Sequence, residues 1–132
     1  MKWTVIFCDE FDAEFQNMQE DLQDELLAHA LLLQEFGPNL GRPTVDTLNG
    51  SKYSNMKELR FALKKEIWRI AFAFDPKRQA ILLAGGNKTG ADQKRFYERL
   101  IRTADARYGR YLNRLDAAHR QIKKGGAHGK KS

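Results

Sequence analysis

The sequence predicts a single α+β domain in which a small antiparallel sheet packs against helices from both ends of the chain. Two patterns predict this class. Apolar side chains recur every three or four residues over residues 11–33 and 96–115, and they alternate with polar ones over residues 56–74. The 132 residues fit the usual size of one domain and suffice for a hydrophobic core.

The N-terminal part predicts a strand followed by a helical hairpin. Residues 2–7 are β-branched and aromatic, which favours a strand. The helical pattern ends at Phe36-Gly37-Pro38, because glycine permits a left-handed helix end and proline cannot continue a helix. We predict a break near residues 17–19, since one helix of about 25 residues would outreach a small sheet. The apolar stripe consists of Phe11, Phe15, Met18, Leu22, Leu26, Ala30 and Leu33.

The middle of the chain predicts an antiparallel meander of three strands. Residues 39–53 are rich in Gly, Pro, Asn, Thr and Ser, which indicates a surface connection with at most a short strand around Val45. Residues 56–63 and 67–74 each alternate apolar and polar side chains, as half-buried strands do. The apolar run at 80–84 predicts a third strand that is covered on both faces.

A long helix is predicted over about residues 92–121. Its apolar stripe consists of Phe96, Leu100, Ile101, Ala104, Tyr108, Leu112 and Leu115. Gly109 could end this helix early, and the residues from Lys123 onward hold almost no apolar side chain, which is typical of disorder. We therefore expect a globular domain over residues 1–115, and a basic helix end with a disordered tail over residues 116–132.

Charge is distributed unevenly along the chain. The formal net charge is +6, yet residues 1–35 hold one cation against nine acids, and the remainder holds 22 Lys and Arg against eight acids. This asymmetry predicts a nucleic acid or acidic partner, although a solubilising surface is the commoner reason for charged runs. No apolar run approaches the roughly 20 residues of a membrane helix, and no secretory leader pattern is present. We therefore expect a cytoplasmic protein with no membrane partner.

Spacing excludes several common catalytic motifs. Residues 85–89 superficially resemble a phosphate-binding P-loop, but Asn87 stands where that motif requires glycine before its lysine. The three histidines are far apart, and Cys8, the single cysteine, allows neither an intramolecular disulfide nor a Cys-Cys zinc pair. Neither G-x-S-x-G nor H-E-x-x-H occurs, so hydrolases built on those motifs lose their main support. We expect no metal and no cofactor.

The remaining chemical signal is a cationic face of the predicted sheet. Alternation places Arg60 and Arg69 opposite the apolar side chains of their strands, and Lys88 follows the third strand closely enough to join them. If the helices cover only the apolar face, these cations lie on an open surface with a floor of small alanines. Because the arginine guanidinium suits phosphate, such a face could bind a phosphodiester and stabilise the charge that develops during its cleavage. Ordinary solvated strand cations are the alternative.

Seven segments of the chain form a characteristic series. They are Phe11-x-x-x-Phe15, Phe36-Gly37-Pro38-x-Leu40-Gly41-Arg42-Pro43, Leu48-x-Gly50-Ser51, Met56-Lys57-Glu58-Leu59-Arg60, Trp68-Arg69-Ile70-Ala71-Phe72-Ala73-Phe74-Asp75, Leu82-Leu83-Ala84-Gly85-Gly86-x-Lys88 and Arg95-Phe96-Tyr97-Glu98. Their order and spacing, over about residues 2–112, resemble the phage-derived HigB branch of the RelE/ParE toxin superfamily. The resemblance implies a RelE-like fold, and the segment after Leu115 lies outside it.

The resemblance also implies a function. Toxins of this kind belong to type II toxin-antitoxin modules, cleave messenger RNA as metal-independent endoribonucleases, typically on the ribosome, and are silenced by a cognate antitoxin. We expect that antitoxin to be a helix-turn-helix protein. RNA carries its own nucleophile, the 2′-hydroxyl, which explains how such a site can lack histidine.

Site residues follow from the matching positions. By resemblance, Arg69 would stabilise the scissile phosphate, while Arg60 and Lys88 would bind flanking phosphate. Lys88 could also protonate the leaving oxygen. Lys57 matches the family's strand lysines and could act as a general base if neighbouring cations lower its pKa. Tyr97 stands where related toxins carry a functional tyrosine, although its place near the helix stripe also suits core packing.

Two other functions stay open at the level of sequence. A ParE-like toxin would bind gyrase without cleaving RNA, but such toxins tend to lack the set formed by Arg60, Arg69 and Lys88. A basic nucleic-acid-binding module without catalysis is supported by charge alone. It would bind DNA and RNA alike, in a salt-sensitive manner, and release no cleaved product.

Overall fold

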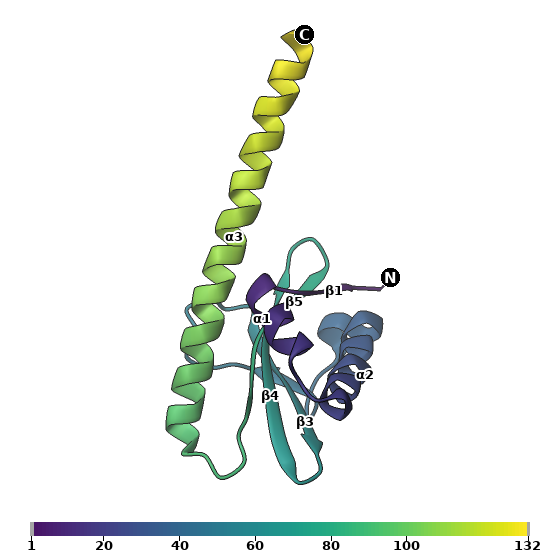
Figure 1. Ribbon diagram of the computed structural model, residues 1–132, viewed down its shortest axis with the longest axis vertical. Helices are drawn as coiled ribbons and strands as arrows, with labels where there is room; N and C mark the ends of the chain where they lie inside the picture. The colour runs from purple at the N-terminus through teal and green to yellow at the C-terminus, as the bar shows by residue number, and fades with distance from the viewer. Residues whose placement is uncertain (1, 132) are drawn as a thin grey trace.

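The structure is a computed structural model that describes the backbone of residues 2–131 and side chains as far as Arg120. Its elements are β1 (Thr4–Phe7), α1 (Asp9–Gln16), α2 (Glu20–Phe36), the 3₁₀ turn η1 (Gly37–Asn39), β2 (Val45–Thr47), β3 (Met56–Leu63), β4 (Glu66–Asp75), β5 (Gln79–Asn87) and α3 (Gln93–Lys131). The predicted α+β class is confirmed, with one five-stranded sheet and helices packed on it (Figure 1).

The sheet is mixed, in the order β1-β5-β4-β3-β2. The meander of β3, β4 and β5 is antiparallel as predicted, and β2 adds a short antiparallel strand to β3. β1 instead runs parallel to β5, with Thr4 opposite Gln79 and Phe7 opposite Leu82. The sequence predicted an antiparallel sheet throughout. No tight turn joins β1 to its neighbour, so tertiary packing alone decides the direction of this terminal strand.

Two N-terminal helices separate at residues 17–19, as the sequence predicted. The second helix ends where Gly37 takes a φ of +52°, a conformation that favours glycine. The indole of Trp3 packs directly against this residue and leaves no room for a Cβ atom. Gly37 is therefore required both by its backbone conformation and by the close approach of the N-terminal segment.

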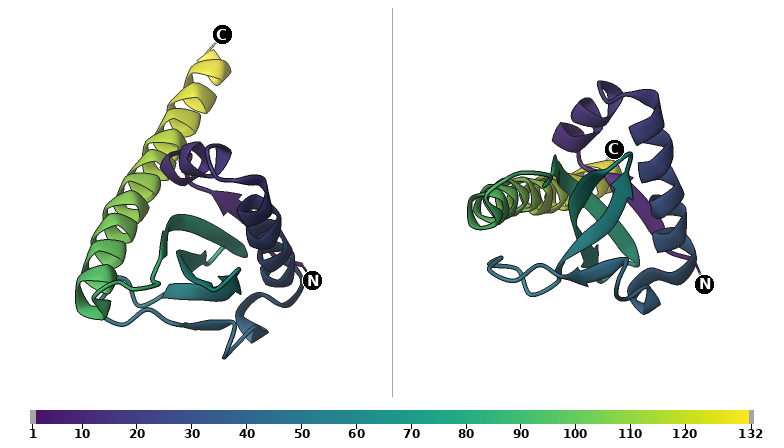
Figure 2. Two further views of the ribbon diagram at one scale, coloured as in Figure 1. Left: turned by 60° about the horizontal axis from the view of Figure 1, so that its bottom comes forward. Right: turned by 90° about the horizontal axis from the view of Figure 1, so that it is seen from below.

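The helices form two layers on opposite faces of the sheet (Figure 2). Consecutive strand residues point to opposite faces. A Cβ atom at Gly85 would lie 3.3 Å from Phe11 of α1, whereas one at Gly86 would lie 2.9 Å from Phe96 of α3. On the α1 side, His29 of α2 also stacks on Phe61 at 4.8 Å. The expectation of an open cationic face is therefore wrong, because α3 lies across it.

α3 continues well beyond the end that the sequence predicted. Its backbone is helical to Lys131, so the helix passes both Gly109 and the segment expected to be a disordered tail. A Cβ atom at Gly109 would lie 3.2 Å from the Tyr53 hydroxyl oxygen. This glycine therefore provides close packing rather than a helix end, and no proline interrupts the residues that follow it. No helix in the described part has both the length and the apolar character needed to cross a membrane.

Acidic residues of α1 form ion pairs with arginines of α3, next to the part of β5 that β1 does not cover. Glu14 binds Arg107 through both carboxylate oxygens, at 2.7 and 2.8 Å. Glu10 accepts hydrogen bonds from Arg110 at 2.8 Å and from Arg114 at 3.2 Å. Part of the charge asymmetry in the sequence thus joins the two helical layers to each other.

The Glu10 contacts predict a pH-dependent contribution to stability. The hydrogen bond from Arg110 is the main cause that lowers the pKa of Glu10 from 4.5 to about 2. Because the folded-state pKa is the lower one, this stabilisation is present above pH 4.5 and is lost as the pH falls toward 2. We expect Glu10→Gln to reduce the free energy of unfolding by about 1 kcal/mol at pH 7, a value limited by solvent screening, and to have almost no effect at pH 2.

Urea unfolding at the two pH values measures this difference. Glu35→Gln is the control, because Glu35 pairs with Lys2 at 3.5 Å on an exposed surface and should contribute little at either pH. Equal effects of Glu10→Gln at pH 7 and pH 2 would contradict the assignment.

Candidate active site

Two arginines face each other across the centre of the sheet. Arg60 of β3 and Arg69 of β4 are direct cross-strand partners. Both side chains lie on the face that α3 covers, and Glu58 shares that face two residues before Arg60. Like charges placed directly opposite each other destabilise a sheet. Such a pair needs a compensating anion, and Glu58 supplies one within the protein.

Arg69 is held in a closed polar cluster. Its Nε lies 3.3 Å from Oε1 of Glu58 and donates to the Tyr97 hydroxyl at 3.2 Å. One Nη1 hydrogen is donated to the Trp68 carbonyl oxygen at 3.0 Å. The side chains of Arg69 and Glu58 are each only 9% exposed. The predicted arginine is therefore buried beneath α3 rather than displayed on an open surface.

Tyr97 completes the cluster from α3. Its hydroxyl donates to Oε1 of Glu58 at 2.8 Å while accepting from Arg69. Burial, followed by the hydrogen bond to Glu58, raises the pKa of Tyr97, so the phenol keeps its proton at neutral pH. The ring also packs edge-to-face on Phe96, with centroids 5.3 Å apart. Tyr97 thus combines the two roles that the sequence left open, with its ring in the packing and its hydroxyl in the site.

Arg60 is the incompletely satisfied member of the pair. Its Nε is buried, and among the described residues no acceptor lies within hydrogen-bonding distance of it. Nη1 lies 3.9 Å from Oδ2 of Asp46, and the side chain is 30% exposed. A buried donor without an acceptor costs on the order of 1–3 kcal/mol. The exposed part of the Arg60 side chain can receive an anion from outside the protein, whereas Nε can reach that anion only after the side chain moves.

Lys88 joins the same group from the segment after β5. Its Nζ lies 5.8 Å from the centroid of the Tyr97 ring. Burial is the main cause that lowers the pKa of Lys88, and the positive charges of Arg69 and Arg60 lower it further. The structure thus brings together Arg60, Arg69, Lys88 and Tyr97, four of the five predicted site residues.

Lys57 does not join them. It lies opposite Thr47 and has the strand parity of Leu59, so it is on the face covered by α2, where Nζ donates to the Thr47 hydroxyl at 3.1 Å. The predicted alanine floor is also wrong, because Ala71 and Ala73 are fully buried. The two errors differ in origin. The Lys57 assignment rests on the resemblance, although its strand parity is that of Leu59, whereas the alanine floor fails because parity does not show what packs above a face.

Glu58 is the site residue that the sequence-based argument missed. Alternation alone predicts a polar residue of a half-buried strand at this position, although its spacing of two from Arg60 places both side chains on one face. That spacing was the available signal. The described residues include no group of three or more His, Cys, Asp or Glu side chains that could hold a metal ion. The cluster offers three cations, one carboxylate and one phenol, a set that can bind phosphate and transfer protons.

Comparisons with known proteins identify the family of the chain. Residues 13–109 match the family described as "Phage derived protein Gp49-like (DUF891)". The chain is 44% identical over 108 residues to "Putative toxin HigB3" of Mycobacterium tuberculosis, covering 82% of this chain and 92% of that protein. It is 39% identical over 116 residues to "Putative toxin HigB2" of the same organism, covering 86% of this chain and 56% of that protein. The match therefore spans nearly all of the first relative and about half of the second.

A solved structure shares the fold. The free state of a mutant of the E. coli toxin RelE superimposes with a TM-score of 0.53, covering 76% of this chain and 95% of that one. The sequence identity is 11%, so this likeness concerns the arrangement of strands and helices and not individual side chains.

Proposed function

Because the chain belongs to the phage-derived Gp49-like family and is a RelE-like HigB toxin homologue, we propose that it is a toxin that cleaves messenger RNA. In this proposal it acts in the cytoplasm within a type II toxin-antitoxin module. Its cognate antitoxin, a helix-turn-helix protein, silences it, and its substrate is a message on the ribosome.

The observation that carries the proposal is the meeting of Arg60, Arg69 and Lys88 on one face with a buried, unsatisfied Arg60 Nε. Three neighbouring cations repel one another, and the orphaned donor adds a further cost. A phosphodiester bound beside them compensates the cations with its charge, and its oxygens can accept from Nε once the Arg60 side chain moves, because Nε is buried. An ordinary solvated strand surface would leave the guanidinium Nε in contact with water.

The proposed reaction needs only proton transfer and charge stabilisation. The 2′-oxygen of one nucleotide attacks the adjacent phosphorus, and the bond from phosphorus to the 5′-oxygen of the next nucleotide breaks. A base takes the proton of the 2′-hydroxyl, and an acid supplies a proton to the departing 5′-oxygen. The products are a 2′,3′-cyclic phosphate and a 5′-hydroxyl end.

The cluster supplies each of these roles in the proposal. Arg69 stabilises the negative charge on the phosphate oxygens, and Arg60 binds the neighbouring phosphate. Lys88 donates the proton to the leaving oxygen, because a lowered pKa makes an ammonium group a better acid near neutral pH. We assign the base role to Glu58, since Lys57 lies on the opposite face of the sheet.

Substrate binding must rearrange the closed cluster. Glu58 and Tyr97 both contact Arg69 Nε, and the Arg69 side chain is only 9% exposed, so in this proposal an incoming phosphate displaces Tyr97 from Nε. Displacing Tyr97 also frees the Oε1 atom of Glu58, to which its hydroxyl donates. In this proposal the phosphate replaces the Tyr97 hydroxyl as the acceptor for Arg69, and the 2′-hydroxyl replaces it as the donor to Glu58.

Purified protein and a defined message test the proposal. We expect cleavage both in EDTA and with Mg²⁺, with products that carry 2′,3′-cyclic phosphate and 5′-hydroxyl ends, and we expect faster cleavage when the message is on ribosomes. Induced expression in cells should arrest growth and shorten messages. Growth arrest with intact messages and broken DNA would favour the gyrase-binding alternative, and salt-sensitive binding without any cleavage would favour the non-catalytic module.

The Lys88 assignment predicts a particular pH dependence. Lys88 must carry its proton to act as an acid, so the rate should fall as the pH rises through its lowered pKa. Arg60→Ala removes one of the charges that lower this pKa. We expect the variant to be slower than wild type but to keep its rate to a higher pH, as measured from initial cleavage rates over pH 6–10.

Lys57→Ala is the matched control for this measurement, because it removes a cation from the same strand but from its other face. Its pH profile should coincide with that of the wild type. If the cleavage rate of Arg60→Ala falls at the same alkaline pH as that of the wild type, this would contradict the role of Lys88 as the acid.

A further inference from the structure

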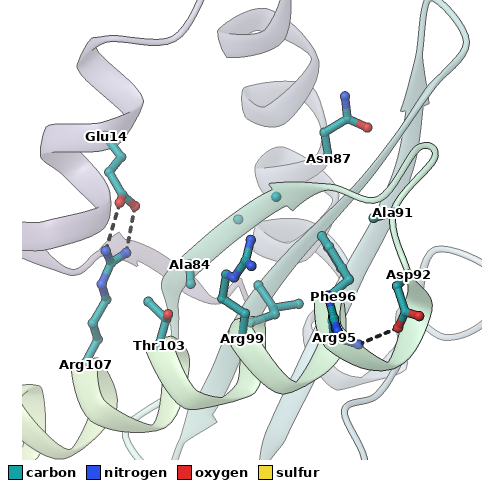
Figure 3. A pocket seen from close by; sticks show the side chains of 13 residues that line it. Glu14, Ala84, Asn87, Ala91, Asp92, Arg95, Phe96, Arg99, Thr103 and Arg107 are labelled. Carbon is teal, nitrogen blue, oxygen red and sulfur yellow. Dashed lines mark hydrogen bonds and ion pairs between the residues drawn. The ribbon is translucent and has the colours of Figure 1, made fainter.

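A cationic hollow lies next to the Arg69 cluster, and the paired rings of Phe96 and Tyr97 stand between the two. The hollow has a volume of about 510 Å³ and lies between α3, α1 and the free edge of β5, beyond the end of β1 (Figure 3). Phe96 lines this hollow, whereas its neighbour Tyr97 belongs to the Arg69 cluster. None of the predicted site residues lines the hollow. Its size suits a single nucleotide or another small ligand.

The hollow carries positive charge that the protein does not neutralise. Arg107 is neutralised by its two hydrogen bonds to Glu14. Asp92 caps α3 by accepting from the backbone N–H of Arg95 at 3.0 Å. In the described part of the chain, by contrast, the guanidinium groups of Arg95 and Arg99 form neither an ion pair nor a hydrogen bond, and Arg99 points from α3 toward β5 (Figure 3).

The walls of the hollow suit a nucleotide rather than a simple anion. Phe96 is partly exposed and presents an aromatic ring beside the two arginines. Gly85 and Gly86 of β5 also line the hollow, but the space beside each glycine is filled by protein side chains, by Phe96 at Gly86 and by Ile70 and Phe11 at Gly85. An aromatic ring next to guanidinium groups is the combination on which single-stranded RNA stacks a base and places its phosphate.

We propose that this hollow binds a nucleotide of the RNA that flanks the cleaved bond, with its base against Phe96 and its phosphate on Arg95 and Arg99. The inference rests on the proposed function, because the neighbouring cluster would hold the scissile phosphate of the same strand. An acidic segment of a protein partner could also pair with the arginines. It would leave the aromatic ring of Phe96 unused, so RNA is the better match.

Binding and cleavage of short RNAs test the proposal. The probes are an oligoribonucleotide with one cleavage site, the same RNA lengthened by one nucleotide on each side, and versions of both with a 2′-deoxy sugar at the cleaved position. The test variant is Arg95→Ala/Arg99→Ala. The matched control is Lys94→Ala/Arg102→Ala, which removes two cations from the other side of the same helix, beside Asn49 and Gly50. Thermal unfolding verifies that both variants are folded.

We expect the wild type to bind the longer 2′-deoxy RNA at least 10-fold more tightly than the shorter one. The test variant should lose this gain, and its plot of log affinity against log salt should become shallower by roughly 0.7 for each lost phosphate contact. With cleavable RNA, its KM for the longer substrate should rise while kcat stays near that of the wild type. The control should behave as the wild type in all three measurements.

Two outcomes would overturn the inference: a wild type that gains nothing from the added nucleotides, or a test variant that matches the control. Loss of antitoxin binding together with normal RNA binding would reassign the hollow to a protein partner. The proposed function fails separately, if the wild type cleaves no RNA. In that case binding of the 2′-deoxy RNAs still decides whether the hollow takes a nucleotide.

Discussion

Replacement of Arg69 by alanine is expected to slow RNA cleavage by roughly 10²–10³-fold, the usual effect of removing one group that stabilises developing negative charge. Arg69 is the most buried cation of the cluster, so little water is available to replace it. Arg69→Lys should recover only part of the rate, because an ammonium group lacks the planar set of donors that matches a phosphate. Single-turnover cleavage of a defined RNA measures the effect directly.

The Arg69 result needs a control for folding, because the substitution leaves Glu58 buried without its cation. Circular dichroism and urea unfolding establish the folded fraction of each variant, and rates are compared per folded molecule. Lys57→Ala should cleave at the wild-type rate, since Lys57 lies on the other face of the sheet. Equal cleavage by folded Arg69→Ala and wild type would remove Arg69 from the chemistry.

Replacement of Glu58 by alanine is expected to lower the free energy of unfolding by about 3 kcal/mol, since removal of one partner of a buried ion pair leaves the other uncompensated. Here Arg69 and the Tyr97 hydroxyl would lose their shared acceptor, and the opposed Arg60 and Arg69 would lose the nearest anion. Glu58→Gln should cost less, because the amide oxygen can still accept from Tyr97. Urea unfolding at pH 7 measures both values.

A double variant separates stability from catalysis. Glu58→Leu with Arg69→Met replaces both charges by apolar groups and should recover most of the lost stability, because well-packed apolar pairs replace buried ion pairs at little cost. It should remain inactive. Glu58→Gln should be folded and slow, as expected if the carboxylate takes the 2′-hydroxyl proton. A Glu58→Gln variant that cleaves RNA at the wild-type rate would exclude Glu58 as the base. If the losses of unfolding free energy in Glu58→Leu and Arg69→Met simply add up to the loss in the double variant, the two residues do not interact.

Most elements could be predicted because they depend on neighbours in sequence. Alternation assigns Arg60 and Arg69 to one face of their strands whatever packs above them, and the three-to-four spacing of apolar residues defines the helices. The helix end at Gly37 is predictable for the same reason, since glycine acts locally, whereas the break at residues 17–19 is predicted from the length of helix that a small sheet can cover. Local signals failed at Gly109, where Tyr53 packs against the helix.

The sequence by itself determined the α+β class, the meander, the shared face of Arg60 and Arg69, and the resemblance to HigB toxins that the comparisons confirm. Tertiary structure alone decided that β1 runs parallel to β5, that α3 buries Arg69, and that Tyr97 and Lys88 meet in one cluster with it. The physical reason is the sequence separation between the interacting residues. Periodicity reports which way a side chain points, whereas its partners come from distant segments, 39 residues away in the Tyr97 and Glu58 contact and 104 residues away in the Arg114 and Glu10 contact.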